Sequence, residues 1–199
     1  MRKRSAVFTG FALIILSTLV LACATAPTST KEDFQPPVVT LKLVEVPYYS
    51  GWWYYDVKVQ PTKGNAGKYG APLALAFIFD IQNPNAYPVM MDEFKFTVAF
   101  DGIDVNTVSS PEIQWIPAGK TNQVRVTAIT DARAALLSLL VTGGFKLKER
   151  ETNVWAQLED WWLAAKDYEL AIEVKEGSAI FKADGLTNVA VFSGKFGPE

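Results

Sequence analysis

Apolar and polar residues alternate over several short stretches of the chain, as they do in strands that bury one face. The clearest stretch places apolar side chains at every second position from Leu73 to Ile81, with Asp80 on the other face. A second stretch runs from Phe94 to Phe100, and Asp101-Gly102 follows it. Asp-Gly favours a two-residue hairpin turn, so residues 103–108 are predicted to return as the next strand.

The remaining pattern adds more strands and two helices. Strands or extended stretches are predicted at residues 39–43, 52–60, 121–130, 168–175 and 189–195. Asp131 is a predicted N-cap for a helix over 132–140, which Gly143-Gly144 would end. A second helix is predicted over 152–166. Many short strands with turn signals and few helices indicate a mostly antiparallel β-sandwich.

The N-terminus has a different character. Arg2, Lys3 and Arg4 precede an uncharged apolar run over residues 6–22, which ends directly before Cys23. A basic start, an apolar run and a small residue before the cut are typical of a secretory signal peptide. Because Cys23, the chain's only cysteine, follows that small residue, the segment resembles a bacterial lipoprotein signal.

That resemblance implies that residues 1–22 are removed and that Cys23 receives a diacylglyceryl group as the new N-terminus. Residues 23–35 are small and polar and are predicted to form a flexible tether. Ala24 follows the cysteine where enteric lipoproteins that stay at the inner membrane have Asp. We therefore expect the outer membrane in a cell with two membranes. The alternatives are an uncleaved N-terminal anchor, since the run is near the length of a membrane-spanning helix, and a plain cleaved signal.

Composition limits the chemistry of the predicted domain, residues 36–199. Removing residues 1–22 takes three of the 19 basic residues and none of the 21 acidic ones. The remaining chain therefore has a mildly acidic net charge, which argues against a nucleic-acid partner. The chain has no histidine, the commonest general base and zinc ligand. We therefore expect no enzyme, no catalytic residues and no cofactor.

Several motifs between residues 77 and 130 stand in a specific order. They are the strand Phe77–Ile81, the triplet Asn83-Pro84-Asn85, Pro88-Val89, Phe94 and Phe96, Gly102, Val105, Ile116-Pro117-Ala118-Gly119-Lys120-Thr121, and Val124 with Val126. Together they resemble the type-2 late-embryogenesis-abundant proteins, also called the WHy (water stress and hypersensitive response) domain. The resemblance covers roughly residues 38–196. It implies a fibronectin-III or immunoglobulin-like sandwich with one short helix, and a role in water-stress or desiccation tolerance.

The triplet at 83–85 has a local physical reading. Pro84 fixes its own φ and pushes Asn83 toward extended dihedrals. Asn side chains bond to nearby backbone groups and mimic turns. We therefore interpret Asn83, Pro84, Asn85 and Gly119 as structural, with a ligand-contact role for Asn83 or Asn85 as the alternative.

Two further groups of residues were weighed as sites. The carboxylates at positions 80, 92, 93, 101 and 104 do not have the spacing of an EF-hand loop, so no metal is predicted. Tryptophans gather in segments outside the family pattern, residues 52–60 and an insertion at 145–166. Trp155, Leu158 and Trp162 share one helical stripe, which predicts packing over the front strands. Trp161 is expected to stay partly exposed. The alternative to this packing, which would form a second small core, is an exposed aromatic patch, with Trp161, Trp53 and Tyr55 as its candidate residues, that meets lipid headgroups, an apolar ligand or a partner.

The function predicted from the sequence is a lipid-anchored, non-catalytic envelope protein that protects against drying through a folded surface. Its predicted partner is the membrane, through the lipid on Cys23. The alternative is an envelope binding module for an apolar or lipid ligand, or for an assembly partner. A carrier would need a cavity between the sheets, lined by side chains such as Phe77, Phe79, Phe96 and Phe100.

Overall fold

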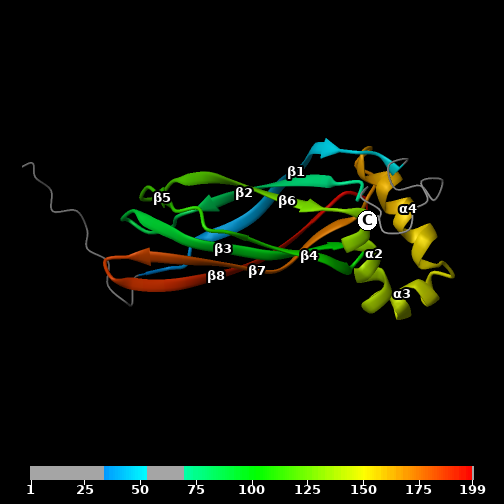
Figure 1. Cartoon of the computed structure of the whole chain (residues 1–199). Coiled ribbons are helices and arrows are strands. Elements are labelled where there is room, and N and C mark those ends of the chain that lie inside the picture. The colour runs from blue at the N-terminus through cyan, green and yellow to red at the C-terminus, as the bar shows by residue number, and fades with distance from the viewer. Residues whose placement is uncertain (1–33, 53–69, 199) are drawn as a thin grey trace, which may run out of the picture.

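A computed structural model describes residues 34–52 and 70–198 of the chain. They form two antiparallel sheets that pack face to face, with helices at one end (Figure 1). The first sheet has the order β1-β2-β6, from β1 (Val38–Tyr49), β2 (Leu73–Gln82) and β6 (Thr121–Thr130). The second has the order β4-β3-β7-β8, from β3 (Val89–Phe100), β4 (Ile103–Ser110), β7 (Ile172–Ala183) and β8 (Leu186–Phe196), and the short β5 (Gln114–Ile116) also pairs with β3. The predicted β-sandwich is confirmed.

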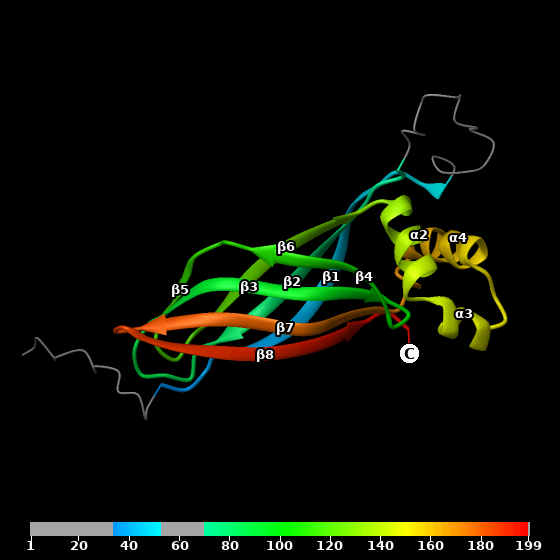
Figure 2. The ribbon, with the colours of Figure 1, turned by 60° about the horizontal axis from the view of Figure 1, so that its bottom comes forward.

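Three helices stand between β6 and β7 in the chain: α2 (Ala132–Val141), α3 (Gly144–Glu149) and α4 (Val154–Ala165). They lie together at one end of the sandwich, while the start of β1 lies at the other (Figure 2). Among the described residues, no helix is long and apolar enough to cross a membrane. The helix predicted from the Asp131 cap is confirmed, whereas α3 is an element that the sequence reading left out.

The space between the sheets is filled by aromatic rings. Phe77 and Phe79 of β2 project from one sheet toward Phe94 and Phe96 of β3 in the other. The ring centres of Phe79 and Phe94 are 4.9 Å apart, and those of Phe77 and Phe96 are 5.0 Å apart. Phe192 of β8 closes the cluster at 4.8 Å from Phe94. Ring contacts at these distances add to the hydrophobic gain of burial.

Two Asp-Gly pairs turn the hairpins of the larger sheet. Asp101 and Gly102 join β3 to β4 with φ of 49° and 76°, and Asp184 and Gly185 join β7 to β8 with φ of 46° and 79°. Positive φ at both central residues is typical of type I′ turns, whose backbone twist matches the twist of the strands they join. The first turn was predicted. The second was not. The strands that it joins, β7 and β8, are longer than the predicted segments 168–175 and 189–195.

The folded domain begins two residues before the predicted boundary at residue 36. Phe34 is buried, with its ring 6.3 Å from that of Tyr87. The backbone of Gln35 exchanges two hydrogen bonds with the Asn85 side chain, at 2.9 and 2.8 Å. The last two residues of the predicted tether, 23–35, therefore belong to the sandwich, because burial of the Phe34 ring and the hydrogen bonds of Gln35 to the Asn85 amide hold them there. Residues 1–33, including Cys23, lie outside the described residues.

The triplet at 83–85 ends β2 by a buried amide network. Asn83 Nδ2 donates to the carbonyl oxygens of Tyr87, Ile116 and Pro117 at 2.9–3.2 Å. Its Oδ1 accepts from the backbone N–H of Asn85 at 3.0 Å and from Asn85 Nδ2 at 2.9 Å. One side chain thus joins the end of β2, the start of β3 and the turn after β5.

We expect Asn83→Ala to lower the free energy of unfolding by roughly 2–4 kcal/mol, because several buried polar groups lose their partner at once. Asn83 is only 1% exposed, so water cannot replace those bonds in the folded state. Urea melts followed by circular dichroism measure the loss. Asn122→Ala is the control, since its amide makes one exposed bond to the Trp115 carbonyl. Equal losses in the two variants would contradict the central role of Asn83.

Candidate contact surface at the helical end

Helix α2 is held at its first turn by side-chain and backbone bonds. Asp131 Oδ1 accepts from the backbone N–H groups of Arg133 at 2.8 Å and Ala134 at 2.9 Å, which satisfies two donors left open at the helix start. The N–H of Ala132 donates to the Gly70 carbonyl at 2.5 Å, which ties the helix to the segment before β2. The position of α2 against the sandwich is therefore fixed at its N-terminus.

Helix α4 buries two of the three side chains that the sequence predicts to pack inward, Leu158 and Trp162, but leaves Trp155 exposed. Its buried side chains include Leu158, Trp161, Trp162 and Ala165, at spacings of three, four and seven from Leu158. Trp161 is 1% exposed and Trp155 is 56% exposed. The expectations that Trp161 is partly exposed and that Trp155 packs inward are both wrong.

The reason is that each buried tryptophan finds a partner for its indole N–H. Trp161 Nε1 donates to Asp101 Oδ2 at 2.6 Å, and its ring stands edge-on to Phe100 with centres 5.4 Å apart. Trp162 Nε1 donates to the Ala71 carbonyl at 2.8 Å. A buried indole needs such an acceptor. Trp161 is thus an anchor of the helix rather than a contact residue.

The β3–β4 turn also holds α3. Lys146 Nζ donates to the Gly102 carbonyl at 2.5 Å, and a guanidinium N–H of Arg150 donates to the Asp101 carbonyl at 2.8 Å. Arg150 also lies 3.6 Å from the Asp101 carboxylate. These bonds and the Trp161 bond attach both α3 and α4 to one two-residue turn of the larger sheet.

This end exposes several large apolar side chains among its charged ones. Leu137, Leu140 and Val141 of α2 and Phe145 of α3 are exposed, with Val141 at 80% and Phe145 at 87%. We call these four residues the helical-end patch. Leu137, Leu140 and Val141 stand three and four residues apart and share one side of α2, and Phe145 follows at the start of α3. Sequence reasoning missed them because it looked for the exposed surface among the tryptophans. Trp53 and Tyr55 lie outside the described residues.

The predicted motif residues gather at the opposite end. The N–H of Gly119 donates to the Asn85 carbonyl at 3.0 Å, and the N–H of Asn83 donates to the Lys120 carbonyl at 2.9 Å. Gly119 has a φ of 63°, a left-handed conformation that glycine adopts without steric cost. Pro84 stands exposed between the two buried asparagines. Asn83, Asn85 and Gly119 therefore hold the backbone at this end of the sandwich through hydrogen bonds, with Pro84 between the two asparagines.

The acidic residues weighed as ligands are spread over the surface. Asp80 lies 3.2 Å from Lys42, Asp92 2.5 Å from Lys182 and Asp104 2.5 Å from Lys175. Within residues 34–52 and 70–198, no three His, Cys, Asp or Glu side chains gather in a group that could hold a metal ion.

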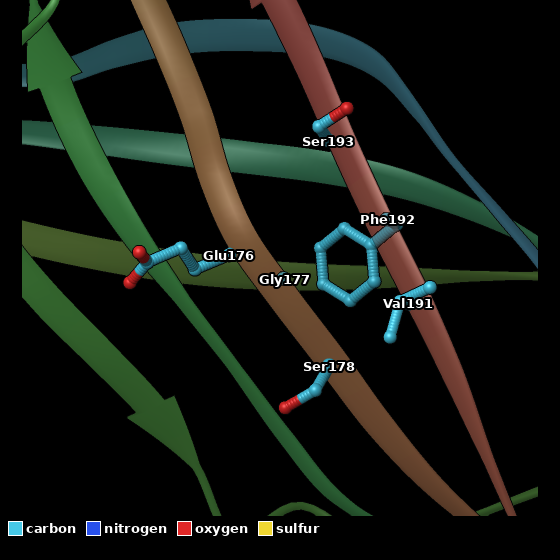
Figure 3. Close-up of a pocket in the computed structure, with 6 residues that line it drawn as sticks. All are labelled: Glu176, Gly177, Ser178, Val191, Phe192 and Ser193. Carbon is cyan, nitrogen blue, oxygen red and sulfur yellow. The ribbon is translucent and has the colours of Figure 1, made fainter.

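A shallow hollow lies where β7 bulges away from β8 (Figure 3). It is lined by Glu176, Gly177, Ser178, Val191, Phe192 and Ser193. A Cβ on Gly177 would stand 2.4 Å from the Phe192 ring, so glycine there leaves room for the ring. Glu176 has a φ of 50° at the bulge. The hollow is open to solvent, and it offers one carboxylate and two hydroxyls on a small apolar floor.

No family model and no curated protein sequence matches the chain. Three solved structures are similar in fold at low sequence identity. A crystal structure of a protein from Archaeoglobus fulgidus has 10% identity over 80% of this chain and 98% of its own, with a TM-score of 0.41. An X-ray structure of the Northeast Structural Genomics Consortium target SoR45 has 10% identity over 81% and 86%, with a TM-score of 0.43. The solution structure of AT1g01470 from Arabidopsis thaliana has 11% identity over 87% and 94%, with a TM-score of 0.44.

We expect Trp161→Ala to lower the free energy of unfolding by roughly 3–5 kcal/mol, the range for losing a large buried aromatic. Asp101 would also lose a close hydrogen-bond donor. Trp155→Ala should cost less than about 1 kcal/mol, because its side chain is mostly exposed. Denaturant melts of both variants make the comparison. A Trp155→Ala variant that melts as early as Trp161→Ala would show that the packing face of α4 is assigned wrongly.

Tyr49 provides a pH-dependent contact between β1 and α4. Its hydroxyl donates to the Trp162 carbonyl at 2.7 Å, and burial raises the pKa of Tyr49 above the ordinary 10.0. A raised pKa means that the protonated hydroxyl stabilises the fold below about pH 10, and that this stabilisation is lost as the pH rises through the folded pKa.

We therefore expect Tyr49→Phe to be less stable than the wild type at pH 7 by about 1 kcal/mol, the usual net value of one hydrogen bond. The difference should shrink in melts above pH 10, where the wild type ionises. Tyr48→Phe is the control, because its side chain is mostly exposed on the same strand. A gap between Tyr49→Phe and wild type that is constant with pH would contradict this assignment.

Proposed function

We propose that this chain is a lipid-anchored protein of the cell envelope that acts without catalysis, through the outer surface of a folded sandwich. Cys23 after an apolar run supports the anchor, and the motifs from Phe77 to Thr130 support a role in water-stress protection like that of the type-2 late-embryogenesis-abundant proteins. In a cell with two membranes, Ala24 after the cysteine favours the outer membrane.

The observation that carries the proposal is the pairing of a filled interior with an apolar exterior at one end. Phe77, Phe79 and Phe96 make ring contacts of 5.0–6.5 Å where a ligand between the sheets would need an empty space. Contiguous apolar patches on a protein surface are typical of interaction sites. Protection would therefore come from contacts made on the outside of the protein.

The second candidate function is an envelope binding module. The filled interior argues against a carrier with its ligand between the sheets. The helical-end patch favours a module whose partner docks on the outside. The two candidates share the anchor and differ in whether loss of the protein weakens survival of drying.

The test starts from Cys23→Ser in the native host. We expect wild type to incorporate acyl label and to lose the mass of residues 1–22, whereas the variant incorporates none, because Cys23 supplies the only thiol. A strain without the protein should survive drying less well than wild type, and complementation with wild type should restore survival better than complementation with Cys23→Ser. The control variant is Ser5→Ala, which keeps the signal and the cysteine.

Equal labelling of wild type and Cys23→Ser would refute the anchor. Normal survival of the strain that lacks the protein would refute the protective role and leave the binding module as the better reading.

A further inference from the structure

The short strand β5 turns a tryptophan to solvent at the end of the sandwich away from the helices. Trp115 is 58% exposed, and Ile113, one residue before the strand, is 60% exposed. Gln114 lies between them, and its Nε2 donates to the Gln123 carbonyl of β6 at 3.3 Å. Since successive side chains of a strand point to opposite sides, Trp115 faces away from β6.

The backbone that presents Trp115 is fixed by hydrogen bonds. The Trp115 carbonyl accepts from Asn122 Nδ2 at 2.9 Å, and Trp115 stands opposite Met90 of β3. The next residue, Ile116, is fully buried, and its carbonyl accepts from Asn83 Nδ2 at 3.1 Å. Trp115 is thus held outward by a strand whose neighbours are buried or bonded.

The chain enters the sandwich at the same end. Asn83 Oδ1 accepts from Asn85 Nδ2 at 2.9 Å, and Asn85 Nδ2 also donates to the Gln35 carbonyl at 2.8 Å. The network that holds the residue after Trp115 therefore also holds the second described residue of the domain. Figure 2 shows β5 and the start of β1 together at the end opposite α2, α3 and α4.

The length of chain before Phe34 limits how far this end can lie from a lipid on Cys23. The ten residues between Cys23 and Phe34 span at most about 40 Å when fully extended. The twelve residues of β1 span about the same distance. The end with Trp115 therefore stays near the membrane in every orientation of the domain, whereas the helical end comes near only when the domain lies along it.

The exposed area distinguishes a membrane from a second copy of the chain. Stable protein–protein interfaces bury about 800 Å² of each partner. Two large side chains that are little more than half exposed offer only on the order of 250 Å² together. A domain already attached by its lipid needs no more than a small contact, because attachment removes most of the entropic cost of association. Tryptophan is a side chain that favours the headgroup layer of a bilayer.

The charge at this end favours neither sign of lipid. Five acidic and four basic residues stand in the turns of this end and in the five strand residues next to them. They are Asp80, Asp92, Glu93, Glu112 and Asp184, against Lys42, Lys120, Arg125 and Lys182. Because these charges nearly balance, a contact made here is expected on neutral, zwitterionic lipid and gains nothing from anionic lipid.

We propose that Trp115, with Ile113 beside it, contacts the headgroup layer of the membrane that holds the anchor, and so sets the Phe34 end of the sandwich against that membrane. This inference rests on the proposed lipid anchor. The indole ring lies at the boundary between headgroups and acyl chains, where its N–H finds an acceptor while its ring leaves water.

The test places an environment-sensitive thiol dye beside Trp115 in the full, acylated chain. Glu112→Cys carries the dye and keeps both Ile113 and Trp115, and the protein is reconstituted through its own anchor into phosphatidylcholine vesicles. Glu149→Cys is the matched control, because it makes the same change at an exposed position of α3, at the other end of the sandwich. Melting curves establish that the variants fold like wild type.

The dye at position 112 should shift to the blue, and lipids with a nitroxide near the headgroup should quench it, while the dye at position 149 stays in water. Trp115→Ser added to Glu112→Cys should remove roughly half of the quenching or more, and Trp115→Tyr should keep most of it, since tyrosine also favours the interface. Trp155→Ser should change nothing, because that tryptophan is equally exposed, at 56%, but lies on α4. Phosphatidylglycerol added to the vesicles should not increase the quenching.

Equal quenching at positions 112 and 149 would overturn the proposal. A blue shift at 112 without quenching would also overturn it, because the cover would then be protein, such as a second copy. Quenching that Trp115→Ser reduces no more than Trp155→Ser would show that the tether alone brings this end close. Quenching that appears only with phosphatidylglycerol would show that charge, and not Trp115, makes the contact.

Wild type separates this inference from the anchor. Cys23 is its only thiol, and an acylated Cys23 takes no dye. Label on wild type would overturn the anchor and this inference with it. Unlabelled wild type together with equal quenching at 112 and 149 would overturn this inference alone.

Discussion

The buried side-chain amide of Asn83 is the constraint on which the end of the sandwich near Phe34 depends. It donates to three carbonyl groups on two segments and orients Asn85, whose own amide then holds the backbone of Gln35. A buried amide with unpaired groups would be costly, so these partners must stay in place together. The network therefore fixes where β2 ends and where the chain enters the sandwich.

Asp101 has the corresponding role at the helical end. Its backbone turns the β3–β4 hairpin in a left-handed conformation, its carboxylate accepts from Trp161, and its carbonyl accepts from Arg150. Asp101, which suits the conformation of the turn, thus also binds the helices that follow about 45 residues later or more. Because the sandwich lies between these two ends, the helical end and the end at Phe34 are held apart by the length of the strands.

The parts of the fold that depend on neighbouring residues alone could be predicted from the sequence. Alternation and turn residues predicted the strand at 121–130, the Asp101-Gly102 turn and the Asp131 cap, because each depends on neighbouring residues alone. The helical period predicted the burial of Leu158 and Trp162 on α4, whereas the exposure of Trp155 and Trp161 was predicted wrongly, because Trp161 turns inward to an acceptor at Asp101 that is distant in sequence. The strand β5 has only three residues, too few for a period to show. The helical-end patch was missed because apolar residues in a helix predict burial.

The separation of the two ends has a consequence for how the surface can work. None of the four patch side chains belongs to the aromatic core or to the two polar networks, so changing them should cost the fold little. Their exposure leaves the hydrophobic gain of burying them available for a second contact. The sandwich thus carries an apolar surface that it does not need for its own folding, and that surface lies at the end opposite the Asn83 network.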